Sequence, residues 1–402
     1  MSSTFRRIAV GAAVLLSAAG LAACGSDDNS SSDNGGSSSS EGISAACKLD
    51  NPPTSQAKAP PQTDVGTASG KVGVILPDTT SSTRYTLYDA PLLTKALSEA
   101  GLSPDVQNAQ GDKNKFASIA QTMIGNGVKV LIIDSIDAAS GAGVEKQADA
   151  AGVQVIDYDR VNLGGTAPYY VSFDNEDVGR LQAQTMIDCL NAQGVDNPNI
   201  IMMNGGTDVD NNAVLFQKGA HEVLDPLVDQ GKATITEEAT VKGWDIETAA
   251  PTFQQALTAA GGTVDGVVAA NDDIANAVIG VLKNTGLNGH VVVTGQDSGV
   301  EGLQNIITGQ QSMTVFKDVT LEAAAASQLA ILLAQGKDPA SAGMTLAPFD
   351  DPVTPSHKID ALLLPTQVIT QANVQDVIDA GALKASEVCK GVESDCQALG
   401  IS

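Results

Sequence analysis

Ten residues of this chain have side chains suited to holding a small polar ligand, and most of them directly follow a short apolar run. They are Arg84, Tyr85, Asp159, Arg160, Asp210, Asn212, Trp244, Asn271, Asp297 and Lys317. Arginine, lysine and asparagine supply hydrogen-bond donors, whereas aspartate accepts the protons that hydroxyl groups donate. An aromatic ring is a flat apolar surface that can cover the C–H face of a pyranose, and Tyr85 and Trp244 are candidates for that role. The set therefore indicates a polyhydroxylated ligand.

Arginine is scarce in this chain, which makes two of these positions more informative. Beyond Arg7 the arginines are Arg84, Arg160 and Arg180. Asparagine and aspartate after a strand also serve as helix N-caps, so each of those candidates has a structural alternative. The scarcity of arginine, and of tryptophan with Trp244 as its single example, favours a ligand role for these rarer residues.

A regular alternation of β-branched runs and longer amphipathic segments must position these residues. Such alternation predicts parallel sheets with right-handed crossovers, in which ligands bind beyond the carboxyl ends of the strands. The predicted strands are Lys71–Leu76, Val128–Asp134, Val153–Asp157, Asn199–Met203, Asp265–Ala269, His290–Thr294 and Ser312–Phe316. The predicted helices are Leu92–Ala100, Asp112–Gly127, Asn175–Ala192, Asn212–Gln230, Glu247–Ala260 and Asp273–Asn284.

The folded part is too long for one sheet of ordinary width. It begins near Gly70 and holds roughly 320 residues, which suggests two domains of typical size. We place the division near Ser172, where an apolar run meets Asp174, Asn175 and Glu176. The predicted fold class is α/β, with two doubly wound parallel-sheet lobes that face each other across a cleft.

The N-terminus has the features of a secretory signal. Arg6 and Arg7 precede an apolar run over residues 8–21, and the small residues before Cys24 resemble a lipoprotein cleavage site. The run is too short to span a bilayer comfortably. We therefore expect residues 1–24 to be a lipoprotein signal, with Cys24 lipidated and holding the exported protein on the outer face of the cytoplasmic membrane. An ordinary secreted protein with a chance cysteine is the alternative.

Composition predicts the conformation of residues 25–69 and limits the class of partner. Residues 25–69 are rich in Ser, Gly, Asp and Asn and later in Pro, so they bury little apolar surface and are predicted to be a disordered tether. The net charge is −25, with 22 basic and 47 acidic residues. Nucleic acid is an unexpected partner for such a chain, because phosphate binding needs a basic surface.

The cysteines beyond Cys24 suggest disulfides. Cys47, Cys189, Cys389 and Cys396 are an even number, and in an oxidising compartment they allow two bonds with three connectivities. We pair Cys389 with Cys396 because they are close in sequence, and Cys47 with Cys189 by default. A regular helix over 389–396 would separate its ends by about 10 Å, too far for a bond.

Other chemistry has weak support. The histidines lack metal-ligand spacing and a nucleophile elbow. Residues 208–219 begin like an EF-hand loop but lack its glycine and its final glutamate. No phosphate-binding glycine motif follows the first predicted strand. We therefore expect no metal, no cofactor and no catalytic residue.

Seven short sequence blocks between Lys71 and Asp379 carry a family resemblance. They are Tyr158–Arg160, Ser172–Glu176, Val209–Ala213, Lys242–Trp244, Ala270–Asp272, Gly295–Asp297 and Met313–Lys317. In their order and spacing the chain resembles the periplasmic sugar-binding proteins of ABC transporters, of the ribose/galactose type, and most closely the D-xylose-binding members. The resemblance implies a type I periplasmic-binding-protein fold with a three-stranded hinge. It also implies a monomeric binder, not an enzyme, for a monosaccharide (xylose first, glucose or galactose as alternatives) and ABC permease subunits as partners.

The resemblance implies a role for each candidate residue. Arg84 and Tyr85 match an arginine–aromatic pair whose second member is usually tryptophan, so Tyr85 is a departure that leaves the sugar open. Arg160, beside Asp159, matches an arginine that binds ring and hydroxyl oxygens. The remaining matches are the second-lobe contacts Asp210 and Asn212, the stacking Trp244, the last polar contacts Asn271, Asp297 and Lys317, and a hinge or helix cap at Asp174 and Asn175.

The resemblance also implies discontinuous lobes. The first would comprise 70–171 with about 317–345 returning to it. The second would comprise 172–316 with about 355–385 returning to it, including the run Ile359–Leu364. The cysteine-bearing tail 386–402 lies outside the family pattern, as does the lipid anchor.

Three other functions are compatible with parts of this pattern. A sugar-sensing co-receptor for a chemoreceptor or sensor kinase would use the same binding residues and is the alternative function. A transcription repressor of the same core fold would need a basic DNA-binding segment in place of the signal. A sugar-processing enzyme would need carboxylates placed across a bond, whereas Asp272 and Asp273 are adjacent.

Overall fold

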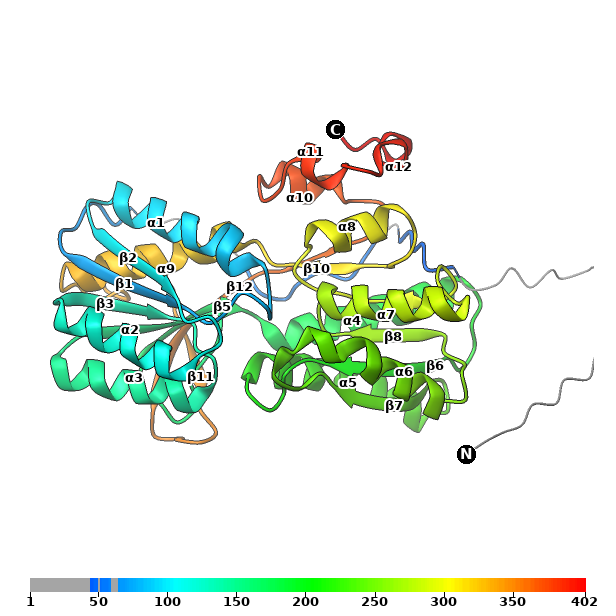
Figure 1. Ribbon diagram of the computed structural model, residues 1–402, viewed down its shortest axis with the longest axis horizontal. Coiled ribbons are helices and arrows are strands. Elements are labelled where there is room, and N and C mark those ends of the chain that lie inside the picture. Colours follow the sequence, from blue (N-terminus) through cyan, green and yellow to red (C-terminus); the bar gives the residue numbers. More distant parts are fainter. Residues whose placement is uncertain (1–43, 50, 59–63) are drawn as a thin grey trace, which may run out of the picture. The chain divides into compact units, whose positions relative to one another are not determined.

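The computed structural model describes residues 44–49, 51–58 and 64–402. Two α/β lobes make up most of this part of the chain (Figure 1). Cys24, the signal segment and much of the predicted tether lie outside the described residues, so the lipidation remains a prediction.

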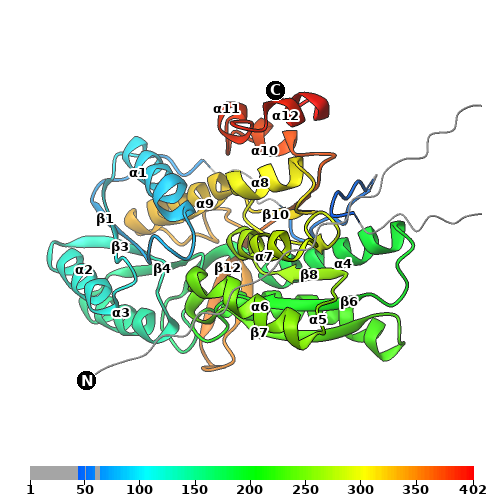
Figure 2. The ribbon, with the colours of Figure 1, turned by 45° about the vertical axis from the view of Figure 1, so that its right-hand side comes forward.

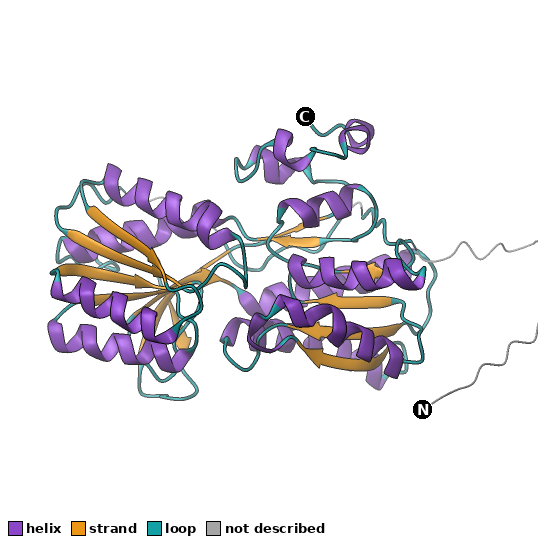
Figure 3. Ribbon diagram, viewed as in Figure 1, coloured by secondary structure: helices purple, strands orange, loops and turns teal. Residues whose placement is uncertain are grey.

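A seven-stranded sheet is the central layer of the first lobe (Figure 3). Its order is β11-β12-β5-β4-β3-β1-β2, with parallel neighbours except for β11 and β12. The strands are β1 (Lys71–Leu76), β2 (Ser103–Asn108), β3 (Val128–Ile133), β4 (Gln154–Tyr158), β5 (Tyr169–Phe173), β11 (Ala347–Asp350) and β12 (Lys358–Leu364). The helices are η1 (Tyr85–Asp89), α1 (Ala90–Glu99), α2 (Lys113–Gly125), α3 (Ala138–Ala151) and α9 (Val319–Ala334).

Alternate residues of the first strand explain the layers of this lobe. Val74 packs in a cluster with Leu93 of α1 and Leu329 of α9, whereas its neighbour Ile75 packs in another cluster with Phe116 of α2. Successive side chains of a strand point to opposite faces, so both faces of the sheet need a helical cover. The predicted doubly wound α/β fold is confirmed here.

The second lobe repeats this plan around a smaller parallel sheet of order β7-β6-β8-β9. Ile201 and Ile200 of β6 pack into separate clusters on its two faces. The strands are β6 (Asn199–Asn204), β7 (Thr234–Thr240), β8 (Gly266–Ala269) and β9 (Val292–Val293). The helices are α4 (Asn175–Ala192), α5 (Asn211–Asp229), η2 (Lys242–Trp244), η3 (Ile246–Thr248), α6 (Ala249–Ala259), α7 (Asp272–Thr285) and α8 (Val300–Ile307).

The chain from β1 onward passes between the lobes at 173–175, 316–319 and 364–367. Near the last two passages, β10 (Thr314–Phe316) pairs antiparallel with β13 (Gln367–Ile369). The middle passage leads into α9, which packs on α1 in the first lobe, where the sequence places the segment 317–345. The first lobe extends to Phe173, slightly beyond the predicted division near Ser172.

The predicted return of Ile359–Leu364 to the second lobe is wrong. These residues belong to β12, which pairs in parallel with β5 from Asp360 opposite Tyr169 to Leu364 opposite Phe173. The run is apolar, and in this position it extends the first-lobe sheet beyond β5, where Ala361 and Leu364 are buried. The chain reaches the second lobe again at Gln367.

The predicted disorder of residues 25–69 is wrong for the described stretch around Cys47. Ala45 is fully buried and its amide donates to the Gly289 carbonyl, while Cys47 forms a disulfide with Cys189 of α4. Thr54 then forms an antiparallel bridge with Gln367 of β13. Because Cys47 is covalently fixed and its neighbours are hydrogen-bonded, composition alone gave the wrong expectation for this stretch.

The C-terminal segment packs beside α8 in both ribbon views (Figure 1, Figure 2). It contains α10 (Gln375–Asp379), α11 (Ala385–Val388) and α12 (Glu393–Leu399), and a disulfide joins Cys389 to Cys396. The helix ends before the bond and restarts after a turn at Gly391, whose φ is +88°. This turn brings the two Cα atoms to 5.9 Å, so the separation expected of a continuous helix does not apply.

Candidate functional site

A cleft with about 330 Å³ of free space, part of it open to solvent, lies at the carboxyl ends of strands from both lobes. Its lining comprises all ten predicted ligand residues together with Ser81, Ser82, Phe216 and Gln296. The predicted residues follow β1 (Arg84, Tyr85), β4 (Asp159, Arg160), β6 (Asp210, Asn212), β7 (Trp244), β8 (Asn271), β9 (Asp297) and β10 (Lys317). The structure therefore brings together residues that are up to 233 positions apart in sequence (317 − 84).

Arg84 is the centre of a buried charge network in the first lobe. Its Nε and Nη2 donate to the two carboxylate oxygens of Asp89 at 3.0 and 2.6 Å, and Nη2 also pairs with Glu322 of α9. Nη1 donates to Asp159 at 3.2 Å. Burial alone would lower the pKa of Arg84, but these carboxylates raise it well above its usual value, so the guanidinium stays charged. Burial raises the pKa of Glu322 to about 8, although Arg84 opposes this shift.

Asp159 is the anion at the centre of the cleft. Its backbone has a φ of +59°, and its carboxylate accepts the Tyr85 hydroxyl proton at 3.2 Å and lies 3.6 Å from Nζ of Lys317. Burial would raise the pKa of this carboxyl, but Lys317, Arg84 and Arg160 together lower it to about 2. Asp159 is therefore ionised at neutral pH and remains a strong acceptor.

Arg160 reaches from the first lobe towards the second. Its Nη2 donates to the Ser81 hydroxyl at 3.1 Å and to the Tyr85 hydroxyl at 3.2 Å. Its Nε lies 3.7 Å from an oxygen of Asp134 and 3.5 Å from an oxygen of Asp210, and it forms no hydrogen bond with the described residues. A buried donor of this kind can bind a ligand oxygen.

Trp244 forms the apolar part of the second-lobe wall. Its Nε1 donates to Asp210 at 3.0 Å, and Asp210 also caps α5 by accepting the Asn212 amide at 2.8 Å. A Cβ atom added to Gly205 would overlap the indole ring, so the ring lies directly against that glycine. The Phe216 ring meets it edge-on, with centroids 6.5 Å apart. One wall thus offers a flat apolar surface beside a carboxylate.

Asn271 and Asp297 complete the polar wall of the second lobe. The Asn271 side-chain oxygen caps α7 by accepting the Ile274 amide at 2.9 Å, which leaves its NH₂ group for the cleft. Asp297 has a φ of +94°, accepts from Gln296 at 2.9 Å and lies 3.6 Å from Nζ of Lys317. Asn271 can therefore cap the helix with its side-chain oxygen and bind a ligand with its NH₂ group.

Asn212 acts chiefly as a link between the lobes. Its side-chain oxygen accepts from Tyr170 at 3.1 Å and from Asn175 at 2.9 Å, and its NH₂ donates to the Asp159 carbonyl at 2.9 Å. One N–H remains for a ligand, so its capacity is smaller than the sequence suggests. The neighbouring Asp174 caps α4 through the Asp177 amide at 3.1 Å, which agrees with the helix-cap interpretation of this block.

Comparison with known proteins decides the family. Residues 72–338 match the family model of the periplasmic binding protein domain. The chain belongs to this family. The family consists of binding proteins, and its type I fold is the one described above.

Several relatives of this periplasmic binding protein have named ligands. The D-xylose-binding periplasmic protein of Escherichia coli (strain K12) is 39% identical over 251 residues, which are 62% of this chain and 74% of that protein. The multiple sugar-binding periplasmic receptor ChvE of Rhizobium radiobacter is 32% identical over 332 residues, 79% of this chain and 92% of that protein. A solved carbohydrate transporter solute binding protein from Chloroflexus aurantiacus, in complex with D-glucose, superposes with a TM-score of 0.71 at 31% identity. It covers 80% of this chain and 98% of its own.

Some residues that line or support the cleft in this periplasmic binding protein are not predicted from the sequence. Asp89 and Glu322 accept hydrogen bonds from Arg84, but Glu322 is 238 positions away and no motif marks it. Phe216 carried a usable signal, because it lies four residues after Asn212 and therefore on the same face of α5. Ser81 lies three residues before Arg84, and Gln296 lies within the block Gly295–Asp297.

Two further properties of the described residues bear on chemistry. They contain no group of three or more His, Cys, Asp or Glu residues placed to hold a metal ion. Among the helices in this part of the chain, none is both long and apolar enough to cross a membrane.

Proposed function

We propose that this protein is the substrate-binding component of an ABC sugar importer and binds a monosaccharide in the cleft between its lobes. One observation carries the proposal: cations, carboxylates, amides and aromatic rings from the segments that follow seven strands line a single cleft. A sugar hydroxyl needs both donors and acceptors, and a pyranose face needs a flat apolar partner. The named ligands of the relatives favour xylose first and glucose as an alternative, and galactose is a further alternative from the sequence resemblance.

The two walls suggest how binding would change the conformation. Arg84, Tyr85, Asp159 and Arg160 belong to the first lobe, and Asp210, Trp244, Asn271 and Asp297 to the second. A ligand that contacts both walls binds most tightly when the lobes are closed, so it shifts the population towards that form. The closed form would then dock on permease subunits.

Calorimetry on the purified protein tests this proposal. Xylose, glucose, galactose, arabinose and ribose are titrated separately, and saturable binding of at least one is expected. Absence of binding to all five contradicts the proposal.

Arg160→Ala tests the assignment of the cleft. Removing charged hydrogen bonds should weaken the best sugar by about 10- to 100-fold. Arg180→Ala is the matched control, because Arg180 pairs with Asp177 outside the cleft and should leave affinity unchanged. Equal affinities of the two variants would remove Arg160 from the binding site.

The proposal includes a lipid anchor at Cys24. Such an anchor would hold the binding lobes near the permease at high effective concentration. Mass spectrometry of the membrane-associated protein should find a lipid on Cys24, and Cys24→Ser should release the protein from membranes. A Cys24→Ser protein that stays membrane-bound would contradict the anchor without affecting sugar binding.

A role as a sugar-sensing co-receptor is the second candidate. The Rhizobium radiobacter relative is named a receptor, which favours this alternative. Sugar uptake in cells lacking the protein distinguishes the two roles, because loss of uptake is expected for an importer component and not for a sensor.

A further inference from the structure

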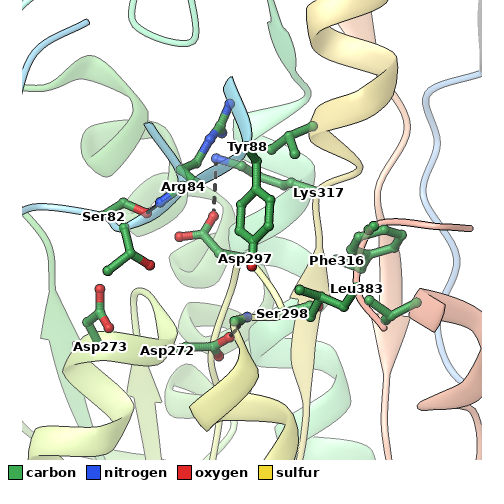
Figure 4. A pocket seen from close by; sticks show the side chains of 15 residues that line it. Ser82, Arg84, Tyr88, Asp272, Asp273, Asp297, Ser298, Phe316, Lys317 and Leu383 are labelled. Carbon is green, nitrogen blue, oxygen red and sulfur yellow. Dashed lines mark hydrogen bonds and ion pairs between the residues drawn. The ribbon is translucent and has the colours of Figure 1, made fainter. Parts of the chain in front are cut away.

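A second chamber adjoins the cleft and has about 590 Å³ of free space, part of it open to solvent. Ser82, Arg84, Asp297 and Lys317 line both spaces, so the chamber and the sugar site share a boundary formed by these side chains. Figure 4 shows the Asp297–Lys317 ion pair at this shared boundary, with Tyr88 beside it.

The far side of the chamber is apolar. Its lining residues come from the first lobe, the hinge and the C-terminal segment: Tyr88, Phe316, Val319, Val377, Ala382 and Leu383. Figure 4 shows Phe316 and Leu383 next to each other on this side. The segment after β13 therefore adds a wall to a space that adjoins the cleft.

This wall is firmly attached to the second lobe. Val377 and Leu383 pack in one cluster with Leu303 and Ile306 of α8. The Gln304 side chain of α8 donates to the Val388 and Lys390 carbonyls, both at 3.0 Å. The Cys389–Cys396 disulfide closes the same segment. The wall is therefore joined to α8 by apolar packing and hydrogen bonds.

One carboxylate in the chamber is free to bind a ligand. Asp272 is occupied, because it accepts from Gln311 at 2.8 Å and from the Gly299 amide at 2.9 Å. Its neighbour Asp273 also lines the chamber but forms no hydrogen bond or ion pair with the described residues. Asp273 can therefore accept a proton from a ligand hydroxyl group.

We propose that the natural ligand is a glycoside: the sugar occupies the cleft and an apolar aryl or alkyl aglycone occupies the chamber. This rests on the proposed sugar-binding function. A second sugar ring would bring hydroxyl groups that need partners on all sides, and burying them against Phe316, Val377 and Leu383 would leave them unpaired. A flat apolar group fits those walls, and one polar substituent could reach Asp273.

Calorimetry with a matched ligand series tests the proposal. The tightest-binding monosaccharide is compared with its methyl and phenyl glycosides, in both anomers, and with a disaccharide of the same sugar. Burial of the phenyl ring should make one phenyl glycoside about tenfold or more tighter than the methyl glycoside. Equal affinity for phenyl and methyl glycosides overturns the proposal, and a disaccharide that binds more tightly than the phenyl glycoside overturns the apolar occupant.

Two substitutions of the same kind locate the effect. Ala382→Asp places a charge in the chamber, whereas Ala380→Asp places it on an exposed residue two positions earlier. The phenyl preference should disappear in Ala382→Asp and persist in Ala380→Asp, with free-sugar affinity unchanged in both. Tyr88→Ala should reduce the preference as a second, independent variant, and a preference that persists in both chamber variants overturns the assignment.

The ligand series also separates the two proposals. If no free sugar binds, the proposed sugar-binding function fails. Titration of the phenyl glycosides alone then tests whether the chamber binds an aglycone. Binding that depends on Ala382 supports the chamber, and absence of binding overturns it.

Discussion

The two walls of the cleft are built by different means. In the first lobe, Arg84, Asp89, Asp159 and Glu322 are paired with one another inside the protein. In the second lobe, polar side chains are held by helix caps and backbone turns, and Trp244 rests on a glycine.

This difference suggests that the ion network makes the first-lobe wall rigid, whereas the second-lobe wall mainly provides ligand contacts. A buried ion network has its charges in place before a ligand arrives, and it is costly to break because each unpaired charge is left desolvated. A capped helix end and an aromatic ring cost less to alter, but they present the surface against which a ligand packs. We therefore expect substitutions within the Arg84 network to reduce stability first, and substitutions of the second-lobe wall to reduce affinity first.

The largest effect is expected from Arg84→Met. Removing this cation leaves Asp89, Asp159 and Glu322 buried without their main partner. The free energy of unfolding, measured by denaturant titration, should fall by about 3–5 kcal/mol. Lys95→Met is the control, since Lys95 pairs with Glu99 on the surface and should change stability by about 0.5 kcal/mol or less. A loss no larger than the control's would mean that the network does not stabilise the first lobe.

A smaller effect is expected from Gly205→Ala. The added methyl group would overlap the Trp244 ring and displace it from the cleft wall. Affinity for the best sugar should fall about tenfold, with a modest loss of stability. Gly280→Ala on α7 meets no atom within 4 Å and should leave affinity unchanged. If Gly205→Ala reduces stability but not affinity, the Trp244 ring does not contact the ligand.

The last prediction concerns the pH dependence of stability and Asp273. Burial, followed by the charges of Asp297 and Glu301, raises the pKa of Asp273 to about 6 in the folded protein. The pKa of an aspartate in the unfolded chain is about 3.9, so the folded state holds this proton more tightly. The stability that this difference contributes is fully present below the unfolded pKa of about 3.9. It is lost as pH rises through the folded pKa of about 6.

Asp273→Asn should remove this part of the pH dependence. Thermal unfolding of both proteins between about pH 4 and 7 measures it. The wild-type protein should lose more stability over this range than the variant. Parallel profiles would show that the second-lobe carboxylate is solvated like a surface group.

Sequence patterns predicted those parts of the molecule that local residues determine. The helix α4 has its predicted bounds because Asp174 supplies the cap and the amphipathic pattern continues to Ala192. All ten predicted residues line the cleft because the carboxyl ends of parallel strands converge. Whether each one contacts a sugar is still a prediction.

Other features depend on contacts between distant residues. The first-lobe position of β12 depends on pairing with β5, almost 200 residues earlier, and its composition suits either sheet. The strand β2 contains Pro104 and is half-exposed, so its hydrophobic pattern is too weak to predict a strand. The carboxylate of Glu322 is indistinguishable in sequence from those of surface helices.

The disulfide between Cys47 and Cys189 determines where a mechanical load would enter the molecule. A force applied to the chain upstream of Ser44 would be transmitted through the disulfide to α4 of the second lobe. It would not reach β1, which follows Cys47 in the chain. In a reducing medium the same force would pass to Thr54 and Gln56, which are hydrogen-bonded to Arg180 and Asp177 of the same helix. A load on this N-terminal segment would therefore be borne by the second lobe, through a covalent bond first and hydrogen bonds second.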